Sequence, residues 1–125
     1  MGVIRKYTCK CGYEKDILAG GGLYGCNVNH IAKFFPEETK VFTKEREEGR
    51  VKQFIMENEL SFCPNCKEIV AVPVFTYTRR DGSVCRFVGN CPDCGGEISQ
   101  VDNEEQAACP KCGLRMTYLP VGNWD

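Results

Sequence analysis

The sequence lacks the features that mark most enzymes and membrane proteins. It has no apolar run long enough to serve as a secretory signal core or a transmembrane helix. His30 is the only histidine, and there is neither a G-x-S-x-G nucleophile elbow nor a glycine loop followed by Lys-Ser or Lys-Thr. We therefore expect a protein that is not an enzyme and that has no membrane partner.

The sequence also has no excess of basic residues. Its formal net charge is −1, and eight ligating thiolates with two zinc ions would bring the charge to about −5. Binding to a phosphate backbone depends on lysine and arginine releasing counterions. A general nucleic-acid binder is therefore disfavoured, and any such role would need a local basic patch.

Cysteine, in contrast, is abundant, with ten residues in a chain of 125. The residues from Met1 to Lys6 run directly into a cysteine motif, with no apolar leader between them. We therefore expect a cytoplasmic protein, in which thiols stay reduced and bind metal more readily than they form disulfides.

Eight of the ten cysteines occur in four close pairs. The pairs are Cys9/Cys11, Cys63/Cys66, Cys91/Cys94 and Cys109/Cys112, and the last three share a C-P-x-C core. Proline presets a tight turn, and a glycine after the second cysteine tolerates a positive φ. Zinc takes four thiolates tetrahedrally, so these eight residues predict two closed sites and two Zn²⁺ ions per chain.

Four pairs can combine into two sites in three ways. We expect the sequential pairing, because short loops cost the least entropy to close. It joins Cys9 and Cys11 to Cys63 and Cys66, and it joins Cys91 and Cys94 to Cys109 and Cys112. A rival pairing joins the two inner pairs to each other, with the outer pairs meeting around them, and a crossed pairing is the third.

Three further residues have metal-binding chemistry but no obvious place in these sites. Cys26 and His30 could join Cys9 and Cys11 in a site of three cysteines and one histidine. That site would leave one complete C-P-x-C pair without a partner. We therefore interpret Cys26 and Cys85 as small buried hydrophobic residues and His30 as an ordinary polar residue.

Helix and strand signals are short and unevenly spread. The sequence predicts a glycine-rich loop over 19–25, a helix over 43–58 and a strand over 69–78. A turn at 80–83 should return the chain as a strand over 84–88, and a last strand is expected over 114–121. Pro73 requires an edge position or a bend.

These elements predict a small metal-stabilised α+β fold with short antiparallel strands, one helix and no large apolar core. We expect two zinc-ribbon or rubredoxin-like modules. Residues 1–75 would form an N-terminal ribbon with the glycine loop and a helical insert. Residues 76–125 would form the hairpin and a compact C-terminal ribbon. Metal coordination would supply the stability that a small core cannot.

The predicted hairpin combines aromatic and basic side chains. Tyr77, Arg79, Arg80 and Arg86 could stack bases and neutralise phosphates of single-stranded RNA or DNA. The alternative is that the aromatic rings cover the small core while the arginines are solvated at the turn. We favour this alternative, because the chain as a whole is acidic.

The motif from Tyr7 to Tyr13, together with the C-P-x-C motifs, resembles rubredoxin-type knuckles. The layout is similar to small bacterial zinc-ribbon proteins that carry no assigned activity. By resemblance to rubredoxins, Cys9, Cys11, Cys63 and Cys66 would hold iron and transfer electrons. The first pair is one residue shorter than in that family and a long insert follows it, so we expect zinc.

The function that these features predict is a zinc-binding, non-enzymatic ribbon protein that acts as a protein-interaction adaptor. A nucleic-acid-associated ribbon that uses Arg79, Arg80 and Arg86 is the alternative. A rubredoxin-like iron electron carrier is a more distant one.

Overall fold

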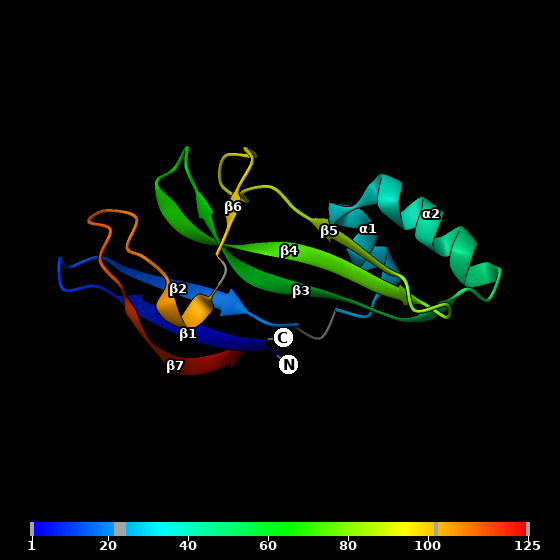
Figure 1. Cartoon of the computed structure of the whole chain (residues 1–125), viewed down its shortest axis with the longest axis horizontal. Coiled ribbons are helices and arrows are strands. Elements are labelled where there is room, and N and C mark those ends of the chain that lie inside the picture. The colour runs from blue at the N-terminus through cyan, green and yellow to red at the C-terminus, as the bar shows by residue number, and fades with distance from the viewer. Residues whose placement is uncertain (1, 22–24, 102, 125) are drawn as a thin grey trace.

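The computed structural model describes residues 2–21, 25–101 and 103–124, which form two antiparallel sheets and two α-helices (Figure 1). The glycine-rich loop predicted over 19–25 includes residues 22–24, which lie outside the described residues. No described helix is both long enough and apolar enough to span a bilayer.

The smaller sheet joins the two ends of the described chain. Its strands lie in the order β2-β1-β7, and they are β1 (Gly2–Thr8), β2 (Glu14–Ala19) and β7 (Thr117–Trp124). Thr8 is opposite Glu14 on one side and Thr117 on the other. The turn after β1 and the segment before β7 therefore lie at the same end of this sheet.

The larger sheet is built around one long hairpin. Its strands lie in the order β5-β4-β3-β6, and they are β3 (Val51–Cys63), β4 (Glu68–Arg79), β5 (Val84–Val88) and β6 (Ser99–Gln100). The hairpin runs from the helices at one end to the cysteine turns at the other (Figure 1). The boundary expected between residues 75 and 76 lies inside β4.

The predicted helix over 43–58 is wrong in position. The helix is α2 (Pro36–Glu47), which begins with Pro36 at its first turn, and residues 51–63 form β3. Gly49, with φ 75°, ends the helical region and donates its N–H to the Arg46 carbonyl oxygen at 3.0 Å. Positive φ at this position suits glycine, which has no Cβ to clash.

A second helix was not predicted. It is α1 (Val28–Phe34), and the side chain of Asn27 caps it by accepting the N–H of His30 at 3.1 Å. A single turn of 3-10 helix, η1 (Glu104–Gln106), follows β6. The prediction of one helix is therefore too low for the described residues.

The predicted hairpin after residue 78 is confirmed, with β5 spanning Val84–Val88. Asp81 closes the turn by accepting the N–H of Ser83 at 2.8 Å. Pro73 lies inside β4 where β5 has ended, and its carbonyl oxygen accepts the N–H of Gly89 at 2.8 Å. The N–H that proline lacks would point to this same side, so the pairing with β3 loses no donor.

The apolar interior is larger than the sequence predicts, and it consists of three clusters. One cluster packs the two sheets face to face, with Tyr7 and Ile17 of the small sheet against Leu60 and Ile69 of the large one. A second lies between the helices and the large sheet. The third combines the valines of β4 with Cys63 and Cys91.

The second cluster is aromatic and contains none of the paired cysteines. The Phe42 ring, fully buried, lies 5.2 Å from Phe75 and 5.0 Å from Tyr77 between ring centroids. Edge-to-face and tilted rings at such distances are favourable beyond the area they bury. The prediction of a chain without a sizeable core is therefore wrong at the helical end of the molecule.

Candidate metal centres

The eight paired cysteines converge into two groups of four. Within each group, all Sγ atoms lie within 4.8 Å of one another. Site A consists of Cys9, Cys11, Cys109 and Cys112, and site B consists of Cys63, Cys66, Cys91 and Cys94.

Site A lies where the small sheet ends. The turn from β1 to β2 supplies Cys9 and Cys11, and the turn before β7 supplies Cys109 and Cys112. The Sγ atoms of Cys9 and Cys112 are 3.4 Å apart, and those of Cys11 and Cys109 are 3.7 Å apart. Pairing of β1 with β7 therefore positions the two turns against each other.

Site B lies at the far end of the long hairpin from the helices. The turn from β3 to β4 supplies Cys63 and Cys66, and the loop after β5 supplies Cys91 and Cys94. The Sγ atoms of Cys63 and Cys94 are 3.5 Å apart, and those of Cys66 and Cys91 are 3.9 Å apart.

The sequential pairing predicted from the sequence is therefore wrong. The inner pairs meet each other and the outer pairs meet around them, which is the rival arrangement. Loop-closure entropy was the wrong criterion, because sheet formation already brings distant segments together. Once β1 pairs with β7, Cys9 and Cys112 are close despite the 102 residues that separate them.

The four cysteine turns end in the same way. The residue after the second cysteine has a positive φ in each, namely Gly12 (98°), Lys67 (54°), Gly95 (72°) and Gly113 (79°). Its N–H donates to the carbonyl oxygen of the first cysteine at 2.8–3.0 Å. Gly95 and Gly113 confirm the predicted role of glycine after a C-P-x-C pair, and Gly12 has the same role in the first turn. Lys67 takes this place in the remaining turn.

Backbone N–H groups also point at the sulfur atoms. The N–H groups of Cys66, Gly96 and Lys111 lie 3.4 Å from the Sγ atoms of Cys63, Cys94 and Cys109, respectively. Donors aimed at a thiol favour its ionised form, because they stabilise negative charge on sulfur. The turns therefore position the cysteines and also favour their thiolate form.

Crowding has the opposite effect on ionisation. Contact with the Cys94 and Cys63 thiols raises the pKa of Cys66 to about 12. A backbone hydrogen bond at Leu114 favours the thiolate of Cys112, but the Cys9 thiol, burial and the Cys11 and Cys109 thiols together outweigh it and raise the pKa of Cys112 to about 12.

Cys109 differs from Cys66 and Cys112. Burial opposes its ionisation, but the backbone N–H groups of Lys111 and Cys112 reverse this and lower its pKa to about 7. Four adjacent thiolates repel one another, and a divalent cation at their centre removes that repulsion.

The donor set fits a thiophilic metal ion. Four sulfur ligands in a closed group suit tetrahedral Zn²⁺ or a single iron ion, and they do not suit the oxygen-preferring Mg²⁺ or Ca²⁺. Each site combines at least one buried sulfur with at least one exposed one. Both sites could hold a metal ion.

Cys26, His30 and Cys85 do not join these groups. Among the described residues, neither Cys26 nor His30 belongs to a potential metal-ligand cluster. Cys26 is exposed, with its Sγ 3.8 Å from the carbonyl oxygen of Phe54, so the expectation of a buried residue is wrong there. Cys85 is half-buried against the aromatic cluster, and His30 packs its ring on Phe34 at 5.3 Å.

The candidate nucleic-acid contacts on the hairpin have partners within the protein. Tyr77 is buried, and its hydroxyl donates to Glu45. Arg79 donates twice to the same carboxylate, at 2.6 and 3.2 Å. Arg80 donates to the carbonyl oxygen of Gly49 at 2.9 Å. Arg86 makes two contacts with Glu59, at 3.1 and 3.3 Å.

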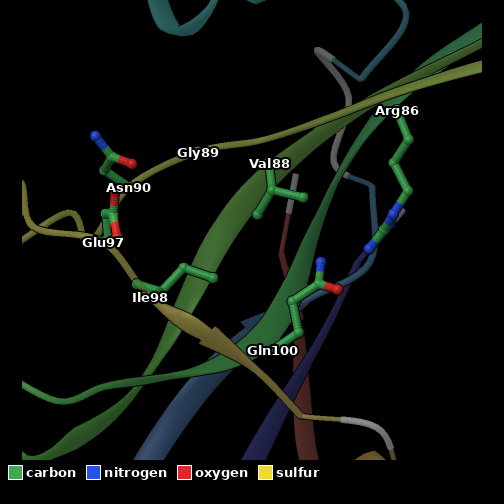
Figure 2. A pocket seen from close by; sticks show the side chains of 7 residues that line it. All are labelled: Arg86, Val88, Gly89, Asn90, Glu97, Ile98 and Gln100. Atoms are coloured by element: carbon green, nitrogen blue, oxygen red, sulfur yellow. The ribbon is translucent and has the colours of Figure 1, made fainter.

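A hollow of about 350 Å³ lies beside the loop that carries the second half of site B. In Figure 2, Val88 and Ile98 point toward each other across it, with Asn90 and Glu97 on one side and Arg86 and Gln100 on the other. Among the described residues, this lining contains no histidine, cysteine or serine.

Sequence reasoning missed a polar network between the two sites. Glu68, at the start of β4, accepts the hydroxyl of Tyr13 and lies close to Lys15 and Lys111. Burial and the Glu68 carboxylate raise the pKa of Tyr13, so its hydroxyl stays a donor at neutral pH. Only the position of Glu68 two residues after a paired cysteine could have drawn attention to it.

Comparisons of the chain with protein-family models, with curated proteins and with solved structures gave no match.

Proposed function

We propose that the protein binds two structural Zn²⁺ ions, one at site A and one at site B, and acts as a non-enzymatic zinc-ribbon adaptor in the cytoplasm. The observation that carries the metal-binding part is the convergence of eight sulfur atoms into two groups, each within 4.8 Å. Four thiols without a metal ion gain no stability from lying this close together, whereas four thiolates around a cation are stabilised by coordination.

Zinc is the better candidate than iron on two grounds. Divalent zinc binds a given sulfur site more strongly than divalent iron does. The Cys9–Cys11 turn is also one residue shorter than a rubredoxin-type knuckle. An electron-carrier role therefore has less support than a structural one.

The sites offer no support for catalysis by the metal. Four thiolates fill the tetrahedral shell of zinc and leave no position for water or substrate. Each site would instead fix two turns relative to each other and so rigidify the adjoining surface.

The surface that best suits a protein partner is the outer edge of β7. Among the described strands, β7 is the last of its sheet, with β1 on one side only. Leu119 and Val121 lie on it and are 70% and 54% exposed. An exposed edge strand is a template for an added strand from another chain, and the bulge next to Pro120 limits such pairing to the segments on either side of it. A protein partner that presents an extended segment fits this edge.

The nucleic-acid alternative has less support. Tyr77 is buried and has no free face on which a base could stack. Arg79 and Arg86 are paired with carboxylates, which would have to be displaced before these side chains could neutralise a phosphate.

Elemental analysis of the purified chain tests the metal assignment. We expect two zinc atoms per chain and a colourless protein. A coloured protein that contains iron would favour the electron carrier. A stably folded chain without metal would refute the proposal.

Two binding measurements test the adaptor role. Photo-crosslinking from position 119 should capture a defined protein, whereas a crosslinker at Lys40, exposed on α2, should not. In a salt titration with single-stranded RNA, tight binding that weakens steeply with salt would favour the nucleic-acid alternative instead.

A further inference from the structure

A single carboxylate lies between the two cysteine sites. Glu68 follows Cys66 of site B by two residues and is half-buried at the start of β4. Its Oε2 atom accepts the hydroxyl of Tyr13 and lies 3.9 Å from the Nζ atom of Lys15. Its Oε1 atom lies 3.6 Å from the Nζ atom of Lys111.

Two of these partners belong to the turns of site A. The carbonyl oxygen of Tyr13 accepts the N–H of Cys9 at 2.9 Å, which closes the first turn. Lys111 lies inside the second turn, and its N–H points at the Sγ atom of Cys109 at 3.4 Å. Glu68 therefore contacts both halves of site A while its own backbone continues from site B.

Backbone and apolar contacts reinforce this connection. The N–H of Ile69 donates to the Tyr13 hydroxyl oxygen at 3.4 Å. Ile69 is buried in the same apolar cluster as Cys109, and Tyr13 packs against that cluster. The turn of site B and both turns of site A thus meet in one continuous set of contacts.

Given the proposed binding of two metal ions, we propose that sites A and B bind metal cooperatively and that Glu68 is the positioning residue that couples them. A metal ion at site A fixes both of its turns, and with them Tyr13 and Lys111. These side chains hold Glu68 and the adjoining turn of site B, so less conformational entropy remains to be lost when the second ion binds.

Coupling of this kind is reciprocal. If metal at site A raises the affinity of site B by a given factor, metal at site B must raise the affinity of site A by the same factor. We expect a factor of about five to ten, at the lower end of the usual range for coupled sites. Loss of Glu68 should bring the factor close to one.

Native mass spectrometry during a zinc titration of the metal-free full chain tests the coupling, because it counts chains with no, one and two ions. Two independent sites, whatever their affinities, leave at least half of the chains with one ion at half-saturation. We expect a smaller fraction in the wild type than the separate zinc affinities of its two sites, measured in Cys63→Ser and Cys109→Ser, predict for independent sites. We expect Glu68→Gln and Glu68→Ala to raise the fraction of one-ion chains to half or more.

The population of one-ion chains separates coupling from general destabilisation. A substitution that weakens both sites by the same factor moves the midpoint to higher zinc but leaves this fraction unchanged. Glu59→Gln is the matched control, because Glu59 pairs with Arg86 on the large sheet and belongs to neither site. It should behave as the wild type.

A wild-type one-ion fraction equal to or above the value that the zinc affinities of Cys63→Ser and Cys109→Ser, each with one site removed, predict for independent sites would overturn the coupling. A Glu68→Gln chain with the wild-type distribution would overturn the role of Glu68. In both cases two ions still bind, so the proposed function stands. A chain that never takes two ions would refute the proposed function together with this inference.

Discussion

Lys67 occupies a backbone conformation that glycine occupies in the other three cysteine turns. Its φ is 54°, and among the described residues it is the only one other than glycine with a positive φ. A side chain in this region costs about 1–2 kcal/mol relative to the right-handed conformation. The turn retains the residue because its N–H closes on the Cys63 carbonyl oxygen at 2.8 Å.

We therefore predict that Lys67→Gly stabilises the metal-loaded protein by about 0.5–1 kcal/mol, after the greater flexibility of glycine in the unfolded chain is subtracted. The measurement is the urea midpoint with zinc in excess. Lys52→Gly is the control, because Lys52 lies in β3 without a positive φ and its replacement should destabilise. A lower midpoint for Lys67→Gly would contradict the strain argument.

The unpaired cysteines should be dispensable for metal binding. Cys26→Ser and Cys85→Ser should leave the zinc content at two per chain, because neither sulfur belongs to a site. Cys63→Ser should reduce it to one, because it removes a buried ligand of site B. Elemental analysis of the three variants checks this, and loss of zinc from Cys26→Ser would reinstate the site with His30.

Residue types alone identified the eight cysteines that converge, but they did not identify their partners. A C-P-x-C turn is local, so proline, spacing and glycine are sufficient to predict it. The pairing depends on contacts between β1 and β7, which are more than a hundred residues apart. No local pattern carries that information.

At the scale of elements, β3 shows why a local pattern can mislead. Val51, Phe54 and Ile55 are spaced as on one face of a helix, and the sequence accordingly predicted a helix there. In the structure this segment pairs with β4 along almost its whole length, from Val51 to Cys63. The pairing partner, and not the intrinsic propensity, decides the outcome.

Helix α2 is attached to β4 through Glu45, and this contact should depend on pH. Hydrogen bonds from Arg79 and then from Tyr77 hold the pKa of Glu45 below its usual value. Because the pKa of Glu45 is lower in the folded than in the unfolded state, its carboxylate stabilises the folded protein at pH values above the usual carboxylate pKa. This stabilisation is lost as the pH falls through the pKa of the folded state.

Replacing Glu45 with Gln should therefore destabilise the protein at neutral pH, and the difference from the wild type should shrink in acid. Urea midpoints of both proteins across pH 3–7 measure this difference in stability. Titrating groups that the two proteins share contribute equally to both midpoints and therefore cancel in the difference. Glu37→Gln is the control, because the Glu37–Lys40 pair is exposed and should contribute little at any pH. A difference that does not vary with pH would contradict the assignment.

At the scale of the whole molecule, the hairpin of β3 and β4 connects two kinds of stabilisation. One end carries site B, and the other is buried under α1 and α2 by the aromatic cluster. The sequence predicted the metal-bound end but not the aromatic core, since Phe35 and Phe42 lie more than thirty residues from Phe75 and Tyr77. We infer that removal of metal loosens the cysteine turns before it loosens the helical end.

Metal loading should release protons. The pKa values of Cys66 and Cys112, both about 12, keep these thiols protonated at pH 7 until metal binds. Each site should therefore release at least one proton per zinc ion, and zinc affinity should fall as the pH is lowered. Calorimetry in buffers of different ionisation enthalpy counts these protons, and an uptake or a count of zero would contradict coordination by thiolates.

Along the sequence, the ligands of site B lie between the two halves of site A, and this sets the order in which a ribosome can complete the two sites. Cys94, the last ligand of site B, is synthesised before Cys109 and Cys112. Site B can thus close on the nascent chain, whereas Cys9 and Cys11 must wait until Cys112 has been made. During that interval the first two thiols stay open to stray metal or oxidant, and this makes the earliest-made cysteines the last to be protected.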